Sequence, residues 1–461
     1  MPTDPADAFL REIWNSLGAD PALLRSVSLT GAGDLPSAFA VSDLAAASVA
    51  AAGLAAAELI SAGASVPSVR VDRRLASFWF GTTFYPVGWS SPPPWDPIAG
   101  DYATEDGWIR LHTNAPHHRT AAVTVLGTRA EKDAVAAAVS RWRKDDLEAA
   151  VVQNGGCAAA MRGLDEWALH PQGAAVLAEP LLWIEDGGMS RSLEPVSRNR
   201  PLAGIRILDL TRVLAGPVAT RFLAGLGADV LRIDPPEWDE PGVIPEVTLG
   251  KRCARLDLRR AADRSVFEGL LASADVLVHG YRPGALDGLG LGEAARQGLR
   301  PGLVDVSLDA YVWSEPWRGR RGFDSLVQMS SGIAAEGMRR FSADKPRPLP
   351  VQALDQATGY LMAAAALRGL TRRLTQGVGS ITRASLARTA ALLIGAEAPE
   401  RTATFAEVND ADFEQRIETT SWGPARRMKP PLQIEGAAMR WDRPASPPGS
   451  AQPAWMPPLP R

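Results

Sequence analysis

The sequence predicts an α/β protein in which a parallel, Rossmann-like sheet is accompanied by a smaller α/β domain. Between residues 205 and 308, short apolar strands alternate with helices, which is typical of a parallel sheet covered on both faces. A length of 461 residues exceeds the usual size of one domain. A composition of 46% hydrophobic and 22% charged residues allows a large buried core. We therefore expect two or more domains, one of them built on the parallel sheet.

The second half of the chain supplies the elements of this sheet. We expect strands and helices to alternate over residues 205–210 (strand), 216–226 (helix), 230–233 (strand), 261–273 (helix), 276–279 (strand) and 303–308 (strand). An Ala-rich stretch, residues 357–374, predicts a further helix because alanine has the highest helix propensity. The stretch SRSLEPVSRNRP, residues 190–201, has the composition of a linker. The Pro-rich residues 441–461 are expected to lie irregularly over the surface.

Charge, cysteine content and the N-terminus limit the classes of partner. A net charge of −3 predicts neither a nucleic-acid binder nor a basic membrane-surface protein. Two distant cysteines, Cys157 and Cys253, exclude a disulfide framework or a cysteine-built zinc site and fit a reducing cytoplasm. The N-terminus lacks the pattern of a signal peptide. Residues 38–64 are apolar but contain Asp43 and Glu58, so we expect a helix packed against protein, with no membrane partner.

Two segments of the chain resemble each other. Residues 35–54 (LPSAFAVSDLAAASVAAAGL) align with 349–366 (LPVQALDQATGYLMAAAA) when Asp43 is set against Asp355. Each segment has a Leu-Pro entry, an aspartate and an Ala-rich helix, followed by a short strand. We interpret this as a diverged internal duplication. The alternative is that two Ala-rich helices align by composition alone.

A turn between a predicted strand and helix could bind an anionic ligand. Residues 211–217 read TRVLAGP, and the N–H groups of a helix N-terminus favour negative charge. Gly216 permits close backbone approach, and Pro217 suits the first helical turn. The turn alone is a weak signal, since many strand–helix turns have this form. The chain lacks a G-x-G-x-x-G motif here, which argues against an ordinary dinucleotide fold.

Three further positions carry chemistry that suits a phosphorylated ligand or a reaction. Lys251-Arg252 follows Gly250, and Tyr281-Arg282 follows a later strand. Cations and an aromatic ring at such positions can hold phosphates and an adenine. For any one of these residues alone, a solvated basic surface is the favoured interpretation. Asp355 stands at a helix N-terminus, where aspartate is most often a cap. The same place suits a nucleophilic carboxylate, because backbone N–H groups would hold it ionised and oriented.

Five ordered blocks of sequence resemble one known family, the class III coenzyme A transferases. The Asp355 helix is the last block, and the four before it are PLAGIRILDLTRVLAGPVATRFLAGLGADVLRID, GKRCARLDL, ADVLVHGYRPGALDGLGL and GFDSLVQMSSGI. Together they cover about residues 201–395. On this resemblance the catalytic aspartate falls on Asp355. The CoA-binding residues fall on Arg212, Val213, Leu214, Ala215, Lys251, Arg252, Tyr281 and Arg282.

The order of segments departs from the family pattern. The resemblance implies a class III CoA-transferase fold in four parts. Residues 1–190 form a diverged half that contains a degenerate Asp-helix segment and the small α/β domain, and residues 191–201 form a linker. Residues 202–400 form the CoA-binding Rossmann-like domain with the catalytic aspartate, and residues 401–461 form a closing segment with a Pro-rich tail. Family resemblance implies a homodimer, whereas the fused layout could build an equivalent assembly within one chain. Adjacent His117 and His118 have poor geometry for joint metal ligation and are expected in the small domain's surface or core.

The resemblance implies a CoA-transferase of the EC 2.8.3 type. It would move coenzyme A from an acyl-CoA thioester to a carboxylic acid through aspartyl anhydride and aspartyl-CoA intermediates on Asp355. The steps need no metal and no cofactor, since the coenzyme A thioester is a substrate. Arginine and alanine richness favours a GC-rich bacterial source. Asp43 is the rival nucleophile, but no CoA-binding segment precedes it, so we interpret Asp43 as a structural cap.

Three other functions stay open. An acyl-CoA racemase of the same fold needs a second acid/base, and the racemases place a histidine before the aspartate of a Gly-x-Asp motif. Here that motif is Gly322-Phe323-Asp324, and phenylalanine cannot move a proton, which favours transfer. A CoA-binding protein without turnover would explain the rearranged layout and Gly288, where the family often has arginine. A Rossmann-type oxidoreductase is disfavoured by the missing glycine fingerprint. The sequence does not specify the acyl donor or acceptor.

Overall fold

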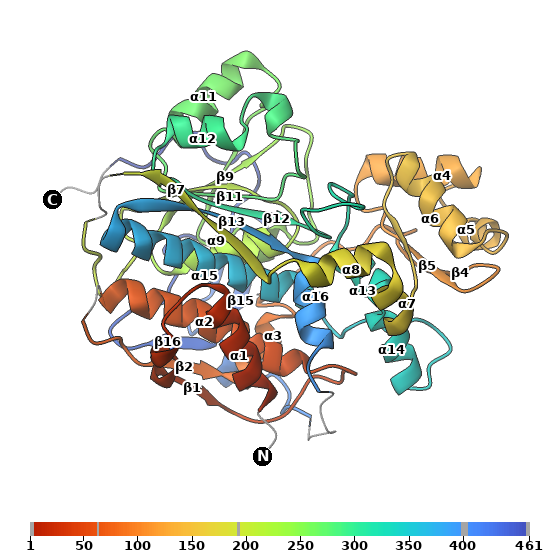
Figure 1. The fold of residues 1–461 in the computed structure, drawn as a ribbon, viewed down its shortest axis with the longest axis horizontal. Helices are drawn as coiled ribbons and strands as arrows, with labels where there is room; N and C mark the ends of the chain where they lie inside the picture. The colour runs from red at the N-terminus through yellow and green to blue at the C-terminus, as the bar shows by residue number, and fades with distance from the viewer. Residues whose placement is uncertain (1–3, 62–63, 191–193, 398–403, 458–461) are drawn as a thin grey trace.

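The computed structural model describes residues 4–61, 64–190, 194–397 and 404–457. These residues form one seven-stranded sheet and three sheets of three strands (Figure 1). Residues 191–193 of the expected linker lie outside the described residues, and residues 194–205 form neither helix nor strand.

The seven-stranded sheet forms the centre of the molecule. Its strands follow the order β10 (Arg252–Arg255), β9 (Asp229–Asp234), β8 (Arg206–Leu210), β11 (Val276–His279), β12 (Val304–Asp309), β13 (Val378–Ser385) and β7 (Leu182–Met189). The first six strands are parallel, and β7, from the first half of the chain, pairs antiparallel with β13. The predicted α/β class with a Rossmann-like parallel sheet is therefore confirmed.

Helices cover both faces of this sheet. On one face, α9 (Ala215–Gly225) and α15 (Ala353–Gln376) pack over Ile207. On the other face, α11 (Ala261–Leu271) packs over Leu208. Neighbouring residues of a strand point to opposite faces, which explains why these runs are continuously apolar. Figure 1 shows α11 and α12 (Glu293–Leu299) above the sheet, with α9 and α15 below it.

A three-stranded sheet repeats part of the central sheet. β1 (Val27–Thr30) is parallel to β2 (Val69–Asp72), and β16 (Leu432–Ile434) is antiparallel to β2, just as β12, β13 and β7 are related. Helix α2 (Val41–Ser61) precedes β2 as α15 precedes β13. Asp43 and Asp355 are each the third residue of their helix. The two segments that align in sequence therefore also share topology and position.

Helices α2 and α15 lie side by side and join the two halves of the chain (Figure 1). Helix α1 (Pro5–Ser16) also packs against α2. Among the described residues, α2 is the one helix long and apolar enough to cross a membrane, but 83% of its most apolar stretch is buried inside the protein. Gly53 allows α2 to lie close to β16, since a Cβ there would be 2.5 Å from Leu432.

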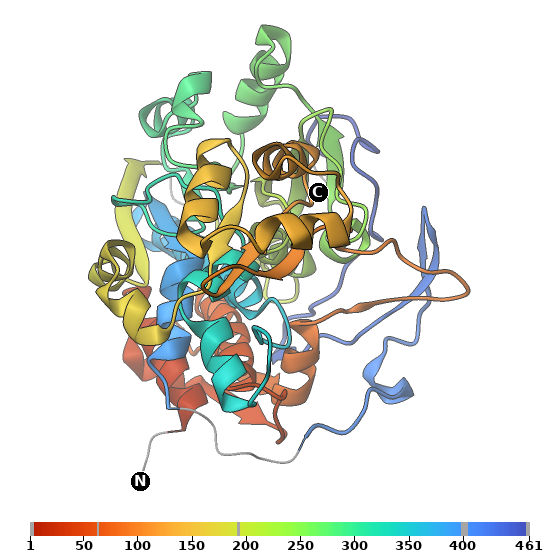
Figure 2. The same cartoon turned by 90° about the vertical axis from the view of Figure 1, so that its right-hand side faces the viewer.

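A small α/β domain from the first half of the chain docks beside the central sheet. It contains an antiparallel sheet of β4 (Gly100–Ala103), β5 (Trp108–Leu111) and β6 (Ala158–Ala160), with helices α4 (Pro116–Leu126), α5 (Lys132–Val139) and α6 (Lys144–Gln153). Figure 2 shows this domain facing the viewer. Cys157 and Ala159 pack against Leu326 and Met329 of α13 (Asp324–Ser330). This contact places the small domain beside the Gly322-Phe323-Asp324 motif.

The remaining elements connect these layers. They are α3 (Arg73–Trp79), α7 (Leu164–Leu169), α8 (Pro171–Ala178), α10 (Ile244–Val247), α14 (Ile333–Arg340), α16 (Leu386–Ile394) and a sheet of β14 (Glu418–Thr420), β15 (Gly423–Arg427) and β3 (Phe84–Pro86). Residues 441–457 contain neither helix nor strand. Within them the Trp441 ring stacks on Trp79 at 5.6 Å between centroids, so this stretch is fixed on the protein.

Candidate active site

A cavity of about 400 Å³ lies at the carboxyl ends of β8, β11 and β12. Ligands of open parallel sheets bind at this edge. The first turn of α15 forms another part of its wall, and the first turn of α4 brings in the small domain. Of the predicted site residues, those that line the cavity are Arg212, Val213, Ala215, Tyr281, Arg282 and Asp355.

The turn between β8 and α9 contains a residue in an unusual conformation. Val213 has φ +63°, in the left-handed region, which costs a residue of this kind roughly 1–3 kcal/mol. The Val213 N–H donates to Glu240 Oε2 at 2.9 Å, and Glu240 is held by Arg232 at 2.6 Å. Because such strain persists where surrounding contacts fix it, and gathers at ligand-binding turns, the geometry supports the predicted binding role of this turn.

Arg212 lies between two aromatic rings. Its guanidinium carbon is 4.9 Å from the centroid of Trp238 and 5.4 Å from that of Tyr281, and Nη2 donates to the Tyr281 hydroxyl at 3.2 Å. Rings and a cation in this arrangement can stack on a purine base and attract a phosphate. The sequence analysis missed Trp238, although an aromatic residue in the loop after β9 was the available signal.

Two of the predicted cations are not brought to the cavity. Lys251 Nζ lies 2.9 Å from Asp209 Oδ2 and 2.9 Å from the Pro217 carbonyl oxygen, with both charged side chains 0% exposed. This contact ties the end of β8 to the first turn of α9. Arg252 pairs with Asp229 at 2.9 Å and donates to the Ala454 carbonyl. Chain position placed both residues near the site, but their side chains support the strands around it.

Leu214 also lies outside the cavity lining. It occupies the N-cap position of α9 and packs, half-buried, against the large hydrophobic core. Its neighbours Val213 and Ala215 line the cavity, so the side chain of Leu214 anchors the turn while its neighbours face the space.

Asp355 has a buried carboxyl group beside a second carboxyl group. It is 8% exposed, accepts a hydrogen bond from the Ala215 N–H, and donates its own N–H to Asp324 Oδ2 at 2.9 Å. Burial and the Asp324 charge raise the pKa of Asp355 well above its usual range, and burial raises the pKa of Asp324 to about 6. The expected backbone N–H contact is present at Ala215, but desolvation and a like charge outweigh this one hydrogen bond and leave the pKa of Asp355 raised.

Gly359 allows α15 to approach α9 at this point. A Cβ at Gly359 would lie 2.5 Å from the Ala215 carbonyl oxygen and 2.8 Å from Val218. Gly359 is one turn beyond Asp355 and therefore lies on the same helix face. The close approach brings the Ala215 N–H within reach of Asp355. Alanine, Ala47, stands at the aligned position of the first copy.

The first-copy aspartate has a different environment. Asp43 forms an ion pair with Arg73, which also pairs with Asp34. In contrast, no lysine or arginine pairs with Asp355 within the described part of the chain. A carboxylate bound by a guanidinium is a weaker nucleophile, and the contrast favours Asp355 over Asp43 for chemistry.

The small domain contributes histidines that the sequence analysis assigned to its surface or core. His117 and His118 occupy the first turn of α4 and line the cavity. The His118 ring meets Phe323 edge-on, at 5.9 Å between centroids, and His112 stacks on Phe323 at 3.7 Å. No spacing in the sequence links His118 to Asp355. The docking of the small domain on α13 creates this proximity.

The arginines on the cavity wall differ in whether a carboxylate pairs with them. Arg320 pairs with Glu148 at 2.9 Å and lies over the Trp317 ring at 3.8 Å. Arg282 and Arg321 form no ion pair within the described residues. Burial, followed by the charge of Arg321, lowers the pKa of Arg282. Two guanidinium groups without a carboxylate partner favour a phosphate or carboxylate in this cavity.

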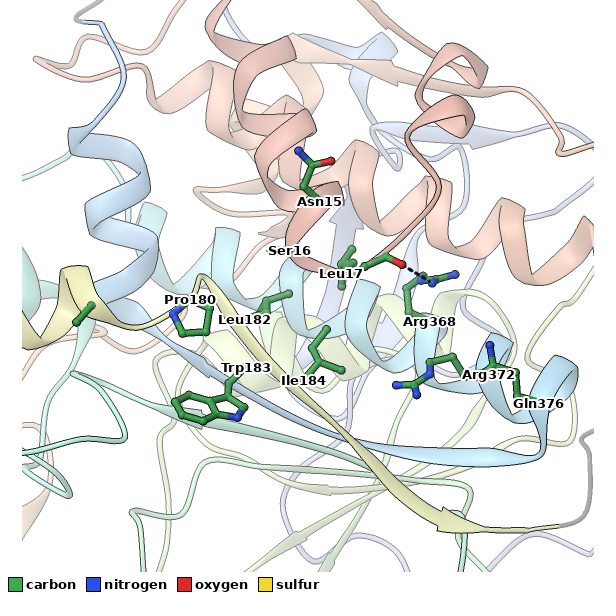
Figure 3. Close-up of a pocket in the computed structure, with 12 residues that line it drawn as sticks. Asn15, Ser16, Leu17, Pro180, Leu182, Trp183, Ile184, Arg368, Arg372 and Gln376 are labelled. Atoms are coloured by element: carbon green, nitrogen blue, oxygen red, sulfur yellow. Dashed lines mark hydrogen bonds between the residues drawn. The ribbon is translucent and has the colours of Figure 1, made fainter.

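A larger cavity, of about 780 Å³, lies between α1, β7 and α15, away from these residues (Figure 3). Its two arginines already have partners, because Arg368 pairs with Glu58 and Arg372 with Asp186. Figure 3 also shows Arg368 donating to backbone beside Leu17, at the end of α1. Size alone therefore does not make this cavity a stronger candidate than the one around Asp355.

Comparison with known proteins locates the family similarity in the second half of the chain. Residues 202–422 match the model of CoA-transferase family III. The resemblance to this family is confirmed for that segment. An acetyl-coenzyme A transferase of Hypoxylon pulicicidum is 32% identical over 206 residues, covering 43% of this chain and 34% of that protein. The succinyl-CoA:glutarate CoA-transferase of Mus musculus is 34% identical over 194 residues, covering 39% and 44%.

The similarity covers less than half of either relative's length. Among solved structures, a CAIB/BAIF family protein from Brucella suis is 26% identical to this chain, with a TM-score of 0.38. The match covers 49% of this chain and 65% of that one. The matched segment of this chain contains the cavity-lining turn after β8, Tyr281-Arg282 and Asp355. His117 and His118 lie before it, in the part of the chain that the family model does not cover.

Proposed function

We propose that this protein is a CoA-transferase of the EC 2.8.3 type, which moves coenzyme A from an acyl-CoA thioester to a carboxylic acid. The observation that carries the proposal is the position of Asp355. It is a buried carboxyl group without a cationic partner among the described residues, in a cavity that also contains Arg212 and Tyr281. The family match and the names of the relatives support the same reaction class. The proposal includes a cytoplasmic location and no cofactor besides the CoA substrate.

In the proposed reaction Asp355 is the nucleophile. Its carboxylate attacks the thioester carbonyl, which forms a mixed anhydride and releases the CoA thiolate. The thiolate attacks the aspartyl carbonyl, which forms an aspartyl-CoA thioester and releases the donor acid. The acceptor carboxylate attacks the aspartyl-CoA thioester, which forms a second anhydride and again releases the CoA thiolate. The thiolate then attacks the acceptor carbonyl of this anhydride, which gives the new acyl-CoA and restores the Asp355 carboxylate. Arg282 and Arg321 are suited to attract the carboxylate or phosphate groups of the substrates.

The raised pKa of Asp355 has a direct consequence for this chemistry. Only the ionised carboxylate can attack, so the ionised fraction limits the rate at acidic pH. The same shift makes the ionised form more basic, and a more basic carboxylate is a stronger nucleophile. The proposal therefore requires transfer activity that increases as the pH rises through the pKa of Asp355.

Intact-protein mass spectrometry after mixing with a panel of acyl-CoA thioesters tests the proposal. We expect a covalent acyl or CoA adduct on the native chain, mapped to Asp355 and absent from Asp355→Ala. Asp43→Ala is the matched control, because it removes the aligned carboxylate from the other copy and should keep the adduct. Measurable CoA binding without an adduct from any thioester would instead indicate a CoA-binding protein without transfer. An adduct on Asp43 would assign the reaction to the first copy.

A further inference from the structure

His118 is a buried side chain whose surroundings do not explain it. It is 4% exposed, and neither of its ring nitrogens has a hydrogen-bond partner among the described residues. A buried polar group without a partner destabilises the folded protein. The imidazole contacts the Phe323 ring, and His118 lines the same cavity as Asp355. A polar group kept in such a position is suited to a ligand that completes its hydrogen bonds.

The charge state of His118 limits what it can do. Burial, followed by the positive charges of His117, Arg321 and Arg282, lowers the pKa of His118 to about 3. The ring is therefore neutral at physiological pH, with one nitrogen as a donor and the other as an acceptor. A neutral imidazole can donate a hydrogen bond to an oxygen that gains negative charge, without giving up its proton.

We propose that His118 donates a hydrogen bond to the acyl oxygen of the thioester and to the oxyanion formed when Asp355 attacks. This role rests on the proposed transfer reaction and assigns it a second catalytic residue, contributed by the small domain. His118 forms no covalent bond and transfers no proton; it stabilises charge that develops on the substrate oxygen. The inference also gives the docking of the small domain on α13 a chemical purpose, since α4 carries the donor into the cavity.

Two substitutions separate hydrogen bonding from other roles. His118→Gln keeps an N–H donor but cannot act as an acid or base near neutral pH, whereas His118→Leu keeps only the apolar bulk. We expect His118→Leu to lower kcat by about 10²–10³-fold, the usual effect of removing one oxyanion donor, and His118→Gln to stay within about 10-fold of the native chain. Affinity for free CoA, measured by calorimetry, should be unchanged in both variants because CoA lacks the acyl oxygen.

A spectroscopic measurement tests the hydrogen bond even if the protein transfers nothing. Acetyl-CoA labelled with ¹³C at the carbonyl is bound to an Asp355→Asn chain, which leaves the thioester intact, and its carbonyl stretch is recorded by infrared difference spectroscopy. We expect a lower carbonyl frequency than in an apolar solvent that donates no hydrogen bonds. This downward shift should disappear when His118→Leu is added and remain when His118→Gln is added.

The outcomes distinguish this inference from the proposed function. An unchanged carbonyl frequency in the His118→Leu background would overturn the donor role, whether or not transfer occurs. Equal loss of activity in His118→Gln and His118→Leu, together with loss of α-deuterium exchange in D₂O, would overturn it in favour of an acid/base role. Failure of the proposed function would instead appear as a missing adduct on Asp355 while the carbonyl shift persists.

Discussion

Replacing Lys251 with methionine tests whether this residue binds CoA or supports the turn over residues 211–217, for which we propose CoA binding. The Lys251 Nζ lies 2.9 Å from Asp209 Oδ2, and both side chains are fully buried. At an effective dielectric constant of about 20, the Coulomb attraction across that distance is about 6 kcal/mol. Much of it is offset by the desolvation of both charges. The measurable quantity is the cost of leaving Asp209 buried and unpaired, about 3–5 kcal/mol.

We therefore expect Lys251→Met to lower the free energy of unfolding by about 3–5 kcal/mol, measured by urea denaturation. Burial alone would raise the pKa of Asp209, but the charges of Lys251 and Arg232 leave it lowered. A carboxyl group with a lowered pKa stabilises the folded state above its unfolded pKa, and that stability disappears as the pH falls through the folded value. The variant should lose this contribution, so its deficit should be largest near neutral pH.

A second substitution, Asp209→Asn, makes the reasoning refutable. It removes the unpaired charge, so the double variant should recover stability relative to Lys251→Met alone. Lys251→Met should also weaken CoA binding, because the turn over 211–217 loses support. In the double variant the CoA affinity should recover together with the stability. If Lys251→Met instead left stability unchanged and weakened CoA binding with a strong salt dependence, Lys251 would contact the ligand directly and the structural interpretation would be refuted.

Three further predictions concern the cavity wall. Trp238→Ala should weaken CoA binding by about 5- to 150-fold, as expected for losing an aromatic ring that stacks on the purine base, a contact worth roughly 1–3 kcal/mol; an unchanged dissociation constant by calorimetry would remove Trp238 from the site. Gly359→Ala should lower transfer activity at least 10-fold by pushing α15 away from Ala215, and unaltered kinetics would contradict the close approach. Asp324→Asn should move the rising limb of the kcat/KM pH profile to lower pH, because it removes the like charge that raises the pKa of Asp355; a profile that stays in place would separate the two carboxyl groups.

The pH dependence of stability has the opposite sign at this carboxyl pair. Raised pKa values mean that the folded state binds more protons than the unfolded chain. Between an unfolded value of about 4 and the folded value of about 6 for Asp324, stability should fall as the pH rises. Urea denaturation of the native chain and Asp324→Asn across this range would show the difference, and parallel curves would contradict it.

The sequence predicted the central sheet well because its signal is local. Apolar runs bounded by turns marked β8, β9, β11 and β12 to within about two residues, and Ala-rich composition marked α15. Positions at strand and helix ends marked the turn at 211–217 and Asp355 as candidates, and the family resemblance gave them their roles. These features depend on neighbours in sequence, and the structure places them together in one cavity.

The parts that the sequence could not predict depend on long-range docking. Side-chain direction decided that Lys251 and Arg252 support strands while Arg282 faces the cavity. Burial, together with the approach of Asp324 from a separate helix, raises the pKa of Asp355, which its position at a helix N-terminus did not predict. His118 reaches the cavity because a domain some 200 residues earlier in the chain packs on α13. No local pattern encodes these distances, so they emerged from the fold alone.

The paired helices α2 and α15 have consequences for how this protein can change. In an assembly of identical halves, every substitution is made twice, once in each aspartate-bearing helix. Here one copy carries the buried Asp355 and its flanking Gly359, whereas the other is committed to an ion pair and a nearly continuous alanine surface. Mutations in α2 can therefore change the scaffold without replacing Asp355. We also expect one chain to bind a single equivalent of CoA at this cavity.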